Sequence, residues 1–228
     1  MNIKKNITEI EKKIAEVCHR CGRNPDDVKL VAVSKTKPAT MIEEAAAAGQ
    51  TLFGESYVQD FADKVDDVTA PVQWHFIGGL QSNKVKYLRN KVAMIHSVDR
   101  FSLAEEINKQ WQKSEQPIDI LLQVNLGGEV SKAGTDEDYL EQLVRQVAAL
   151  PMLRIKGLMS LPPYFDDPEE VRPFFRRLKE LATMIENLAI PGVEMRELSM
   201  GMSHDFEVAI EEGATMIRIG TAIFGARN

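Results

Sequence analysis

The chain of 228 residues contains two cysteines, Cys18 and Cys21, which form a single CxxC pair. The pair lies near the end of an N-terminal helical pattern rather than after a strand, where redox CxxC motifs are found. No second pair is present to complete a zinc site. We therefore expect two reduced thiols on a helix and no metal.

Excess positive charge and long apolar runs are also missing. The net charge is −6 at pH 7, which provides no electrostatic attraction to nucleic acid or anionic membranes. No apolar stretch is long enough to cross a bilayer. The N-terminus, MNIKKNITEIEKKIAEVCHR, is charged throughout and lacks the apolar segment of a secretory signal. We expect a cytoplasmic protein that binds neither nucleic acid nor membranes.

No linker rich in glycine, serine and proline interrupts the chain, which predicts a single domain over residues 1–228. Strand-like runs alternate with helical patterns along its whole length, including helical patterns at 82–91 and 168–188. This alternation is typical of parallel βαβ units. Eight units and an extra N-terminal helix predict a (β/α)₈ TIM barrel rather than an open doubly wound sheet. The expected strands are 29–35, 51–56, 72–79, 92–99, 118–126, 153–161, 195–201 and 215–225.

The first strand ends in a lysine, Lys35, shortly before Pro38 opens a helix. Functional groups of such barrels lie at the C-terminal ends of the strands. Alternation places Val31, Val33 and Lys35 on one face. An inward lysine is partly desolvated, which lowers its pKa and leaves more free amine to attack aldehydes and ketones. The alternative is a lysine that flanks the strand and reaches water.

The last two strands are followed by residues suited to an anion. Barrels of this type commonly bind phosphate between the loops after strands seven and eight. Glycines and hydroxyls before a helix leave backbone N–H groups free to donate. The candidate phosphate ligands are Ser199, Gly201, Met202 and Ser203 after the seventh strand and Gly220 and Thr221 after the eighth.

Arg218 shares a strand face with Gly220. An inward arginine needs a partner, because an unpaired buried charge is costly. That partner is either a carboxylate such as Glu197 or a ligand. The lysine, the phosphate loops and the arginine together predict pyridoxal 5′-phosphate (PLP). A class I aldolase acting on a sugar phosphate is the rival, but it needs a deeper lysine flanked by acid and base groups.

Seven motifs are distributed along nearly the whole chain: AVSKTKP, FGESYVQ, WHFIGGLQSNK, SVD, KGLMS, LSMGMSHDFEVAI and MIRIGTAIFGAR. Together they resemble the YggS/PROSC family of PLP-binding proteins. The resemblance implies the barrel of alanine racemase, with Lys35 holding PLP as an internal aldimine and Arg218 facing the pyridine nitrogen. It also implies a phosphate site formed by the loops after strands seven and eight. One departure is Ser56, where the family usually has asparagine.

The resemblance implies a role in PLP (vitamin B6) homeostasis without established catalysis, with PLP-dependent apo-enzymes as partners. We expect a monomer that lacks the second domain from which alanine racemase takes a catalytic tyrosine. Arg218 can only donate to the ring nitrogen, which disfavours its protonation and weakens the electron sink. The alternatives are a small PLP-dependent racemase or lyase, and a regulatory module acting through partner proteins.

Three further residues, His75, Lys37 and Lys132, have side chains that could take part in chemistry. His75 lies near the end of a strand, and we expect a hydrogen-bonding residue inside the barrel rather than a catalytic base. Lys37 and Lys132 could also react with an aldehyde. Both are expected to be surface lysines.

Overall fold

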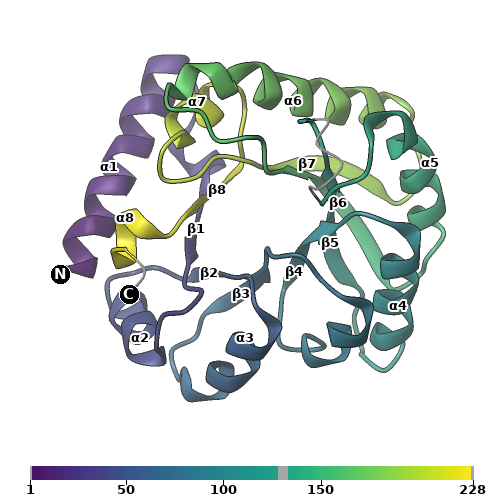
Figure 1. Cartoon of the computed structure of the whole chain (residues 1–228), viewed down its shortest axis with the longest axis horizontal. Coiled ribbons are helices and arrows are strands. Elements are labelled where there is room, and N and C mark those ends of the chain that lie inside the picture. The colour runs from purple at the N-terminus through teal and green to yellow at the C-terminus, as the bar shows by residue number, and fades with distance from the viewer. Residues whose placement is uncertain (1, 128–132, 227–228) are drawn as a thin grey trace.

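The computed structural model describes residues 2–127 and 133–226, in which eight parallel strands form a closed barrel in sequence order (Figure 1). The first strand pairs with both the second and the eighth. This closure confirms the predicted (β/α)₈ barrel and excludes the open sheet. The strands are β1 (Lys29–Val33), β2 (Leu52–Glu55), β3 (Gln73–Phe76), β4 (Met94–Val98), β5 (Ile118–Val124), β6 (Leu153–Ser160), β7 (Val193–Ser199) and β8 (Met216–Ile219).

Helices surround the barrel (Figure 1). The extra helix α1 buries isoleucines at helical spacing and packs against α2, α7 and α8. The helices are α1 (Ile3–Cys21), α2 (Ala39–Ala47), α3 (Val58–Lys64), α4 (Phe101–Trp111), α5 (Glu137–Ala148), α6 (Arg172–Asn187), α7 (Phe206–Glu211) and α8 (Thr221–Phe224). Short 3₁₀ helices are η1 (Pro25–Asp27), η2 (Val65–Asp67), η3 (Ser82–Tyr87) and η4 (Pro168–Val171).

Two segments differ from the prediction. Of the predicted helix 82–91, only Ser82–Tyr87 is helical, as the 3₁₀ helix η3, and a turn follows in which Asn90 adopts a left-handed φ of 61°. The predicted strand 215–225 stops at Ile219, and α8 follows. A short apolar run such as TAIF fits a strand or a buried helix equally well by periodicity. The end of β8 is therefore also the start of a helix.

The barrel has an inner core and an outer core. The inner core contains Val31, Met94, Leu121, Met159 and Met216, whereas Ala32 belongs to the larger core between strands and helices. The face of β1 that carries Val31 thus points into the barrel, as the alternation predicted. By the same alternation, the side chain of Arg218 lies on the face of Met216, inside the barrel.

Both cysteines are free thiols on α1, and Cys18 is buried whereas Cys21 is exposed. Within the described ranges no group of three or more His, Cys, Asp or Glu side chains is arranged to hold a metal ion. Nor does any helix in this part of the chain have the length and apolar character to cross a membrane.

Candidate functional site

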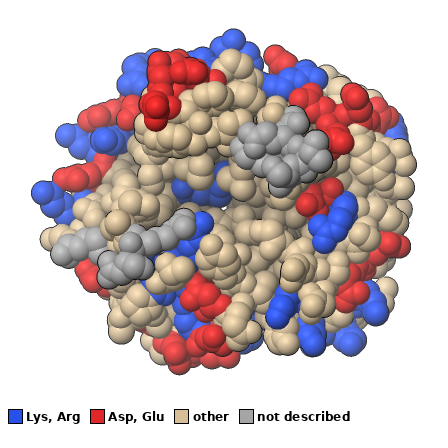
Figure 2. Space-filling view, viewed as in Figure 1, with Lys and Arg blue, Asp and Glu red and all other residues tan. Residues whose placement is uncertain are grey.

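The predicted site residues lie together at the C-terminal ends of the strands. The barrel order places β8 between β7 and β1, so the loops that follow these three strands are neighbours. Figure 2 shows this face from the side seen in Figure 1, with a central hollow that contains lysine or arginine atoms. We refer to this hollow, at the C-terminal ends of the strands, as the barrel mouth. Ligands of (β/α)₈ barrels bind at this end.

Lys35 lies in a tight turn directly after β1. The turn Ser34–Lys37 is closed by a hydrogen bond from the Lys37 N–H to the Ser34 carbonyl at 3.0 Å. Lys35 is half-buried there. The ammonium of Lys37 donates to the Ala226 carbonyl at 3.0 Å, and Lys132 lies outside the described residues. The strand predicted over 29–35 ends at Val33, so the turn, and not strand alternation, directs the side chain of Lys35.

Arg218 is buried inside the barrel, with 4% of its surface exposed. Its guanidinium donates to the Ser199 hydroxyl at 2.6 Å and to the Ser160 carbonyl at 2.9 Å. Burial lowers the pKa of Arg218 to about 10, and the Asp205 carboxylate opposes that shift. Among the described residues, no carboxylate lies within ion-pair distance of this guanidinium.

Glu197 does not pair with Arg218, so the predicted alternative of a Glu197–Arg218 ion pair is wrong. Its carboxylate forms an ion pair with Lys29 and accepts a hydrogen bond from the Thr215 hydroxyl at 2.8 Å. Lys29 and Thr215 lie at the N-terminal ends of β1 and β8. The carboxylate of Glu197 is therefore directed toward the N-terminal end of the barrel, away from Arg218.

A pair of buried histidines extends the polar contacts of Arg218. His96 Nδ1 is 2.9 Å from the Ser199 hydroxyl, and His96 Nε2 is 2.8 Å from His75 Nδ1. His75 also lines a cavity of about 950 Å³ at the N-terminal end of the barrel. This confirms His75 as an interior hydrogen-bonding residue. His96 was missed, although an inward position on a predicted barrel strand could have indicated it.

Burial keeps both imidazoles neutral. It lowers the pKa of His75 to about 3, with Lys29 as a smaller cause. Burial also lowers the pKa of His96 well below its usual range, and the positive charges of Arg218 and of His75 in its protonated form contribute. Neutral imidazoles can both donate and accept, so they satisfy Ser199 without adding a second buried cation beside Arg218.

This neutrality predicts a stability that falls in acid. The unfolded chain protonates histidine below its usual pKa of about 6.5, whereas the folded chain does not. Each buried histidine then costs up to about 1.4 kcal/mol per pH unit as the pH falls below that value. The free energy of unfolding, measured with urea at several pH values between about 6.5 and 4.5, should depend less steeply on pH in His75→Gln. The difference in slope should correspond to about one proton. His19→Gln, on the exposed face of α1, should keep the wild-type slope. An unchanged slope in His75→Gln would contradict the assignment.

The loop after β7 requires glycine at position 201. Gly201 has a φ of +88°, and a Cβ there would lie 2.6 Å from the Ala209 Cβ and 3.1 Å from the Phe206 Cα. The Met202 N–H donates to the Asp205 carboxylate at 2.6 Å. The loop is therefore a tight turn packed directly onto the first residues of α7.

Several backbone donors of these loops have no protein partner. The N–H groups of Gly201, Ser203 and Gly220 donate to no acceptor within the described part of the chain. Gly220 also approaches β1 closely, since a Cβ there would lie 3.3 Å from the Val33 carbonyl oxygen. Unpaired N–H groups beside a buried arginine make this part of the mouth suited to an anion.

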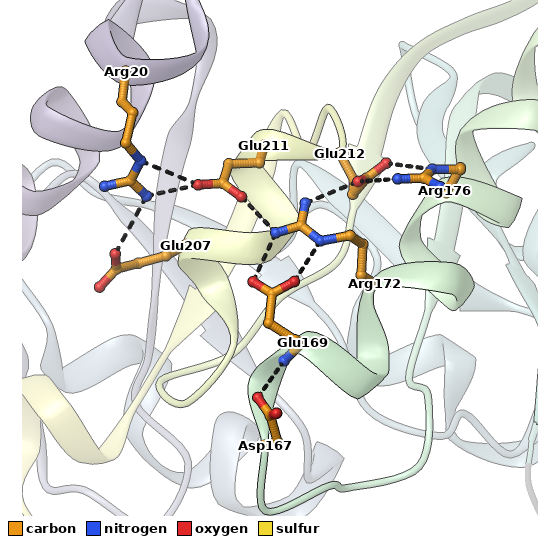
Figure 3. Close-up of polar contacts among 8 residues, drawn as sticks. All are labelled: Arg20, Asp167, Glu169, Arg172, Arg176, Glu207, Glu211 and Glu212. Carbon is orange, nitrogen blue, oxygen red and sulfur yellow. Dashed lines mark hydrogen bonds and ion pairs between the residues drawn. The ribbon is translucent and has the colours of Figure 1, made fainter.

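Ion pairs on the outside of the barrel hold α7 in place (Figure 3). Arg172 of α6 binds both carboxylate oxygens of Glu169 at 2.7 and 2.8 Å. It also binds Glu211 at 2.6 Å and Glu212 at 2.9 Å. From the other side, Arg20 of α1 pairs with Glu211 at 2.6 Å. These contacts clamp the C-terminal end of α7, and α7 directly follows the loop of Gly201.

The central arginine of this network should contribute measurably to stability. Arg172→Met removes charge-assisted hydrogen bonds to the partly buried carboxylates of Glu211 and Glu212 and to the exposed carboxylate of Glu169, which should lower the free energy of unfolding by about 1–3 kcal/mol. Arg145→Met breaks an exposed pair with Glu141 and should cost less than about 0.5 kcal/mol. Urea unfolding of the two variants checks this. Equal losses would show that the network adds nothing beyond a surface pair.

Comparisons with known proteins agree with this geometry. The family described as alanine racemase, N-terminal domain, matches residues 6–228. A relative from Aquifex aeolicus named pyridoxal phosphate homeostasis protein is 46% identical over 100% of this chain and 99% of its own. A relative of the same name from Escherichia coli (strain K12) is 42% identical over 100% of this chain and 97% of its own.

Solved structures show the same similarity. PipY from Synechococcus elongatus PCC7942, solved with PLP bound, has a TM-score of 0.82 and 37% identity, covering 93% of this chain and 100% of its own. Alanine racemase from Corynebacterium glutamicum has a TM-score of 0.68 at 18% identity, covering 96% of this chain and 61% of its own, which shows a shared fold. The chain therefore belongs to the alanine racemase N-terminal-domain family and, within it, to the pyridoxal phosphate homeostasis proteins.

Proposed function

We propose that this protein holds PLP covalently through Lys35 at the barrel mouth and serves PLP homeostasis rather than steady catalysis. The observation that carries the proposal is the position of Lys35 just after β1, beside the strand that carries the buried Arg218 and the loops with unpaired backbone donors. A PLP-bound relative of 37% identity supports it. When bound, PLP supplies an aldehyde that condenses with amines and a ring that withdraws electrons.

The residues at the mouth fit PLP. Its phosphate needs several donors, and the N–H groups of Gly201, Ser203 and Gly220 lack protein acceptors among the described residues. The hydroxyls of Ser203 and Thr221 add further donors on the same loops. The N–H of Met202 donates to Asp205, so Met202 contributes to the phosphate site through the shape of the loop rather than as a donor.

Arg218 is suited to the ring nitrogen. A buried guanidinium can donate to that nitrogen but cannot accept from it, which favours the unprotonated ring. The Ser199 hydroxyl accepts a hydrogen bond from Arg218 and also contacts His96. We therefore assign Ser199 to the arginine rather than to the phosphate.

A small PLP-dependent racemase or lyase is the second candidate, because alanine racemase shares the fold. An unprotonated ring nitrogen weakens the electron sink that such reactions use, which disfavours them without excluding them, so the search for product from L-alanine separates the two candidates. In the homeostasis role, we propose a monomeric cytoplasmic protein whose partners include PLP-dependent apo-enzymes that receive the cofactor. Ser56 is one atom shorter than asparagine, so a contact from there to PLP would need a water.

Borohydride trapping tests the proposal. Purified protein mixed with PLP should gain a visible absorption band, and reduction should place one phosphopyridoxyl group per chain on the peptide of Lys35. Incubation of the unreduced, PLP-loaded protein with L-alanine should give no D-alanine beyond trace amounts. Label found chiefly on Lys37 or Lys132 would refute the site, and multiple turnovers per second would refute the homeostasis role.

A further inference from the structure

The turn that carries Lys35 is strained. Lys35 is the second residue of the turn Ser34–Lys37, and Thr36 is the third, with a φ of +62°. Glycine or asparagine normally occupies a left-handed third position. A β-branched residue there is an outlier, because its Cβ crowds the backbone. Such strain persists where the surroundings hold the backbone in place, and it is often found at functional sites.

Two side chains of α3 hold this turn. The Asp60 carboxylate accepts the Thr36 N–H at 2.8 Å. The Lys64 ammonium donates to the Ser34 carbonyl at 2.9 Å and to the Lys37 carbonyl at 3.2 Å. Lys64 therefore binds both ends of the turn at once, and Asp60 binds the strained residue between them.

Glu55 ties this cluster to the barrel wall. Glu55 is the last residue of β2, the strand beside β1, and none of its surface is exposed. Its carboxylate accepts the Ser34 hydroxyl at 2.6 Å and forms an ion pair with Lys64 at 2.8 Å. Burial raises the pKa of Glu55, while the charge of Lys64 opposes that shift.

Lysine suits the centre of this cluster. The Lys64 ammonium is 8% exposed and lies within 3.2 Å of four oxygens, from Ser34, Lys37, Glu55 and Asp60. Its three rotatable donors can serve oxygens in different directions, whereas a planar guanidinium cannot. An ammonium this fully engaged is not available as a nucleophile, so a role in shaping the turn is the one its contacts support.

We propose that Lys64, supported by Asp60 and Glu55, is a positioning residue that fixes the strained turn and so places the Lys35 amine for attack on an aldehyde at the barrel mouth. The inference rests on the proposed function, in which Lys35 is the reactive amine. It adds that the reactivity of Lys35 depends on a lysine that touches neither the aldehyde nor the cofactor.

Three variants test the role of Lys64. Lys64→Met keeps the length of the side chain and removes the ammonium. The double variant Lys64→Met/Glu55→Gln also removes the carboxylate that would otherwise be left buried and unpaired, which protects the fold. Lys91→Met is the matched control, because Lys91 forms an exposed pair with Asp66. Thermal unfolding establishes which variants are folded.

Two readouts are compared in the folded variants. The first is hydrogen exchange of the Thr36 amide, measured without PLP, which should quicken about tenfold or more when the turn loosens. The second is the rate of PLP capture on Lys35 by borohydride trapping, which should fall about 10- to 100-fold when the amine is misplaced. Lys91→Met should change neither.

The outcomes separate this inference from the proposed function. Faster exchange with slower capture supports the positioning role. Unchanged exchange, or faster exchange with wild-type capture, overturns it. If the wild-type protein captures no PLP on Lys35, the proposed function fails. The exchange data then still decide whether Lys64 holds the turn.

Discussion

Replacing Lys35 with alanine should abolish covalent capture of PLP, whereas Lys37→Ala should leave it intact. Lys35 follows the inward-facing positions of β1, while the ammonium of Lys37 donates to the Ala226 carbonyl. The loss should be complete, because a covalent bond requires the amine itself. Borohydride reduction followed by mass spectrometry of the intact chain measures the captured fraction.

The Lys35→Ala variant should still bind PLP reversibly, because its phosphate donors and Arg218 remain. Equilibrium dialysis should therefore show saturable but weaker binding. Stoichiometric labelling of Lys37 or Lys132 in this variant would mean that the mouth does not select one lysine.

Removing the phosphate of the ligand should have the second-largest effect. Pyridoxal should bind about 10²- to 10³-fold more weakly than PLP, since each hydrogen bond to a charged group contributes about 1.5–3 kcal/mol. The N–H groups of Gly201, Ser203 and Gly220 would lose their anionic acceptor. Titrations followed by absorption give both affinities, and equal values would remove the argument for an anion site.

The variant Gly201→Ala tests whether the anion site includes the loop after β7. A Cβ at position 201 would meet the Ala209 Cβ at 2.6 Å and would sit on a backbone with a φ of +88°. The variant should bind PLP at least about tenfold more weakly, because the loop must shift. Gly192→Ala is the matched control, because Gly192 has a φ of +78° with no atom within 4 Å. It imposes comparable backbone strain without the clash, and PLP affinity should be unchanged.

The sequence alone determined the architecture and placed Lys35 just after the first strand. Periodicity of two in the strands and of 3.6 in the helices depends on neighbouring residues, so the alternation of βα units was readable directly. The inward face of β1 and the position of Lys35 after it follow from the same local rule. Periodicity was insufficient where it is ambiguous, as in residues 215–225, which contain both β8 and α8.

The tertiary structure decided the partners of the buried charges. Arg218 binds Ser199 and Ser160 rather than Glu197, and Lys64 reaches back to the turn of Lys35. These contacts join residues from 19 to 58 positions apart. Their geometry depends on the register of neighbouring strands and on barrel closure, which no local pattern encodes. The sequence therefore indicates where Lys35 lies along the chain, and the closed barrel determines which side chains hold its turn in position.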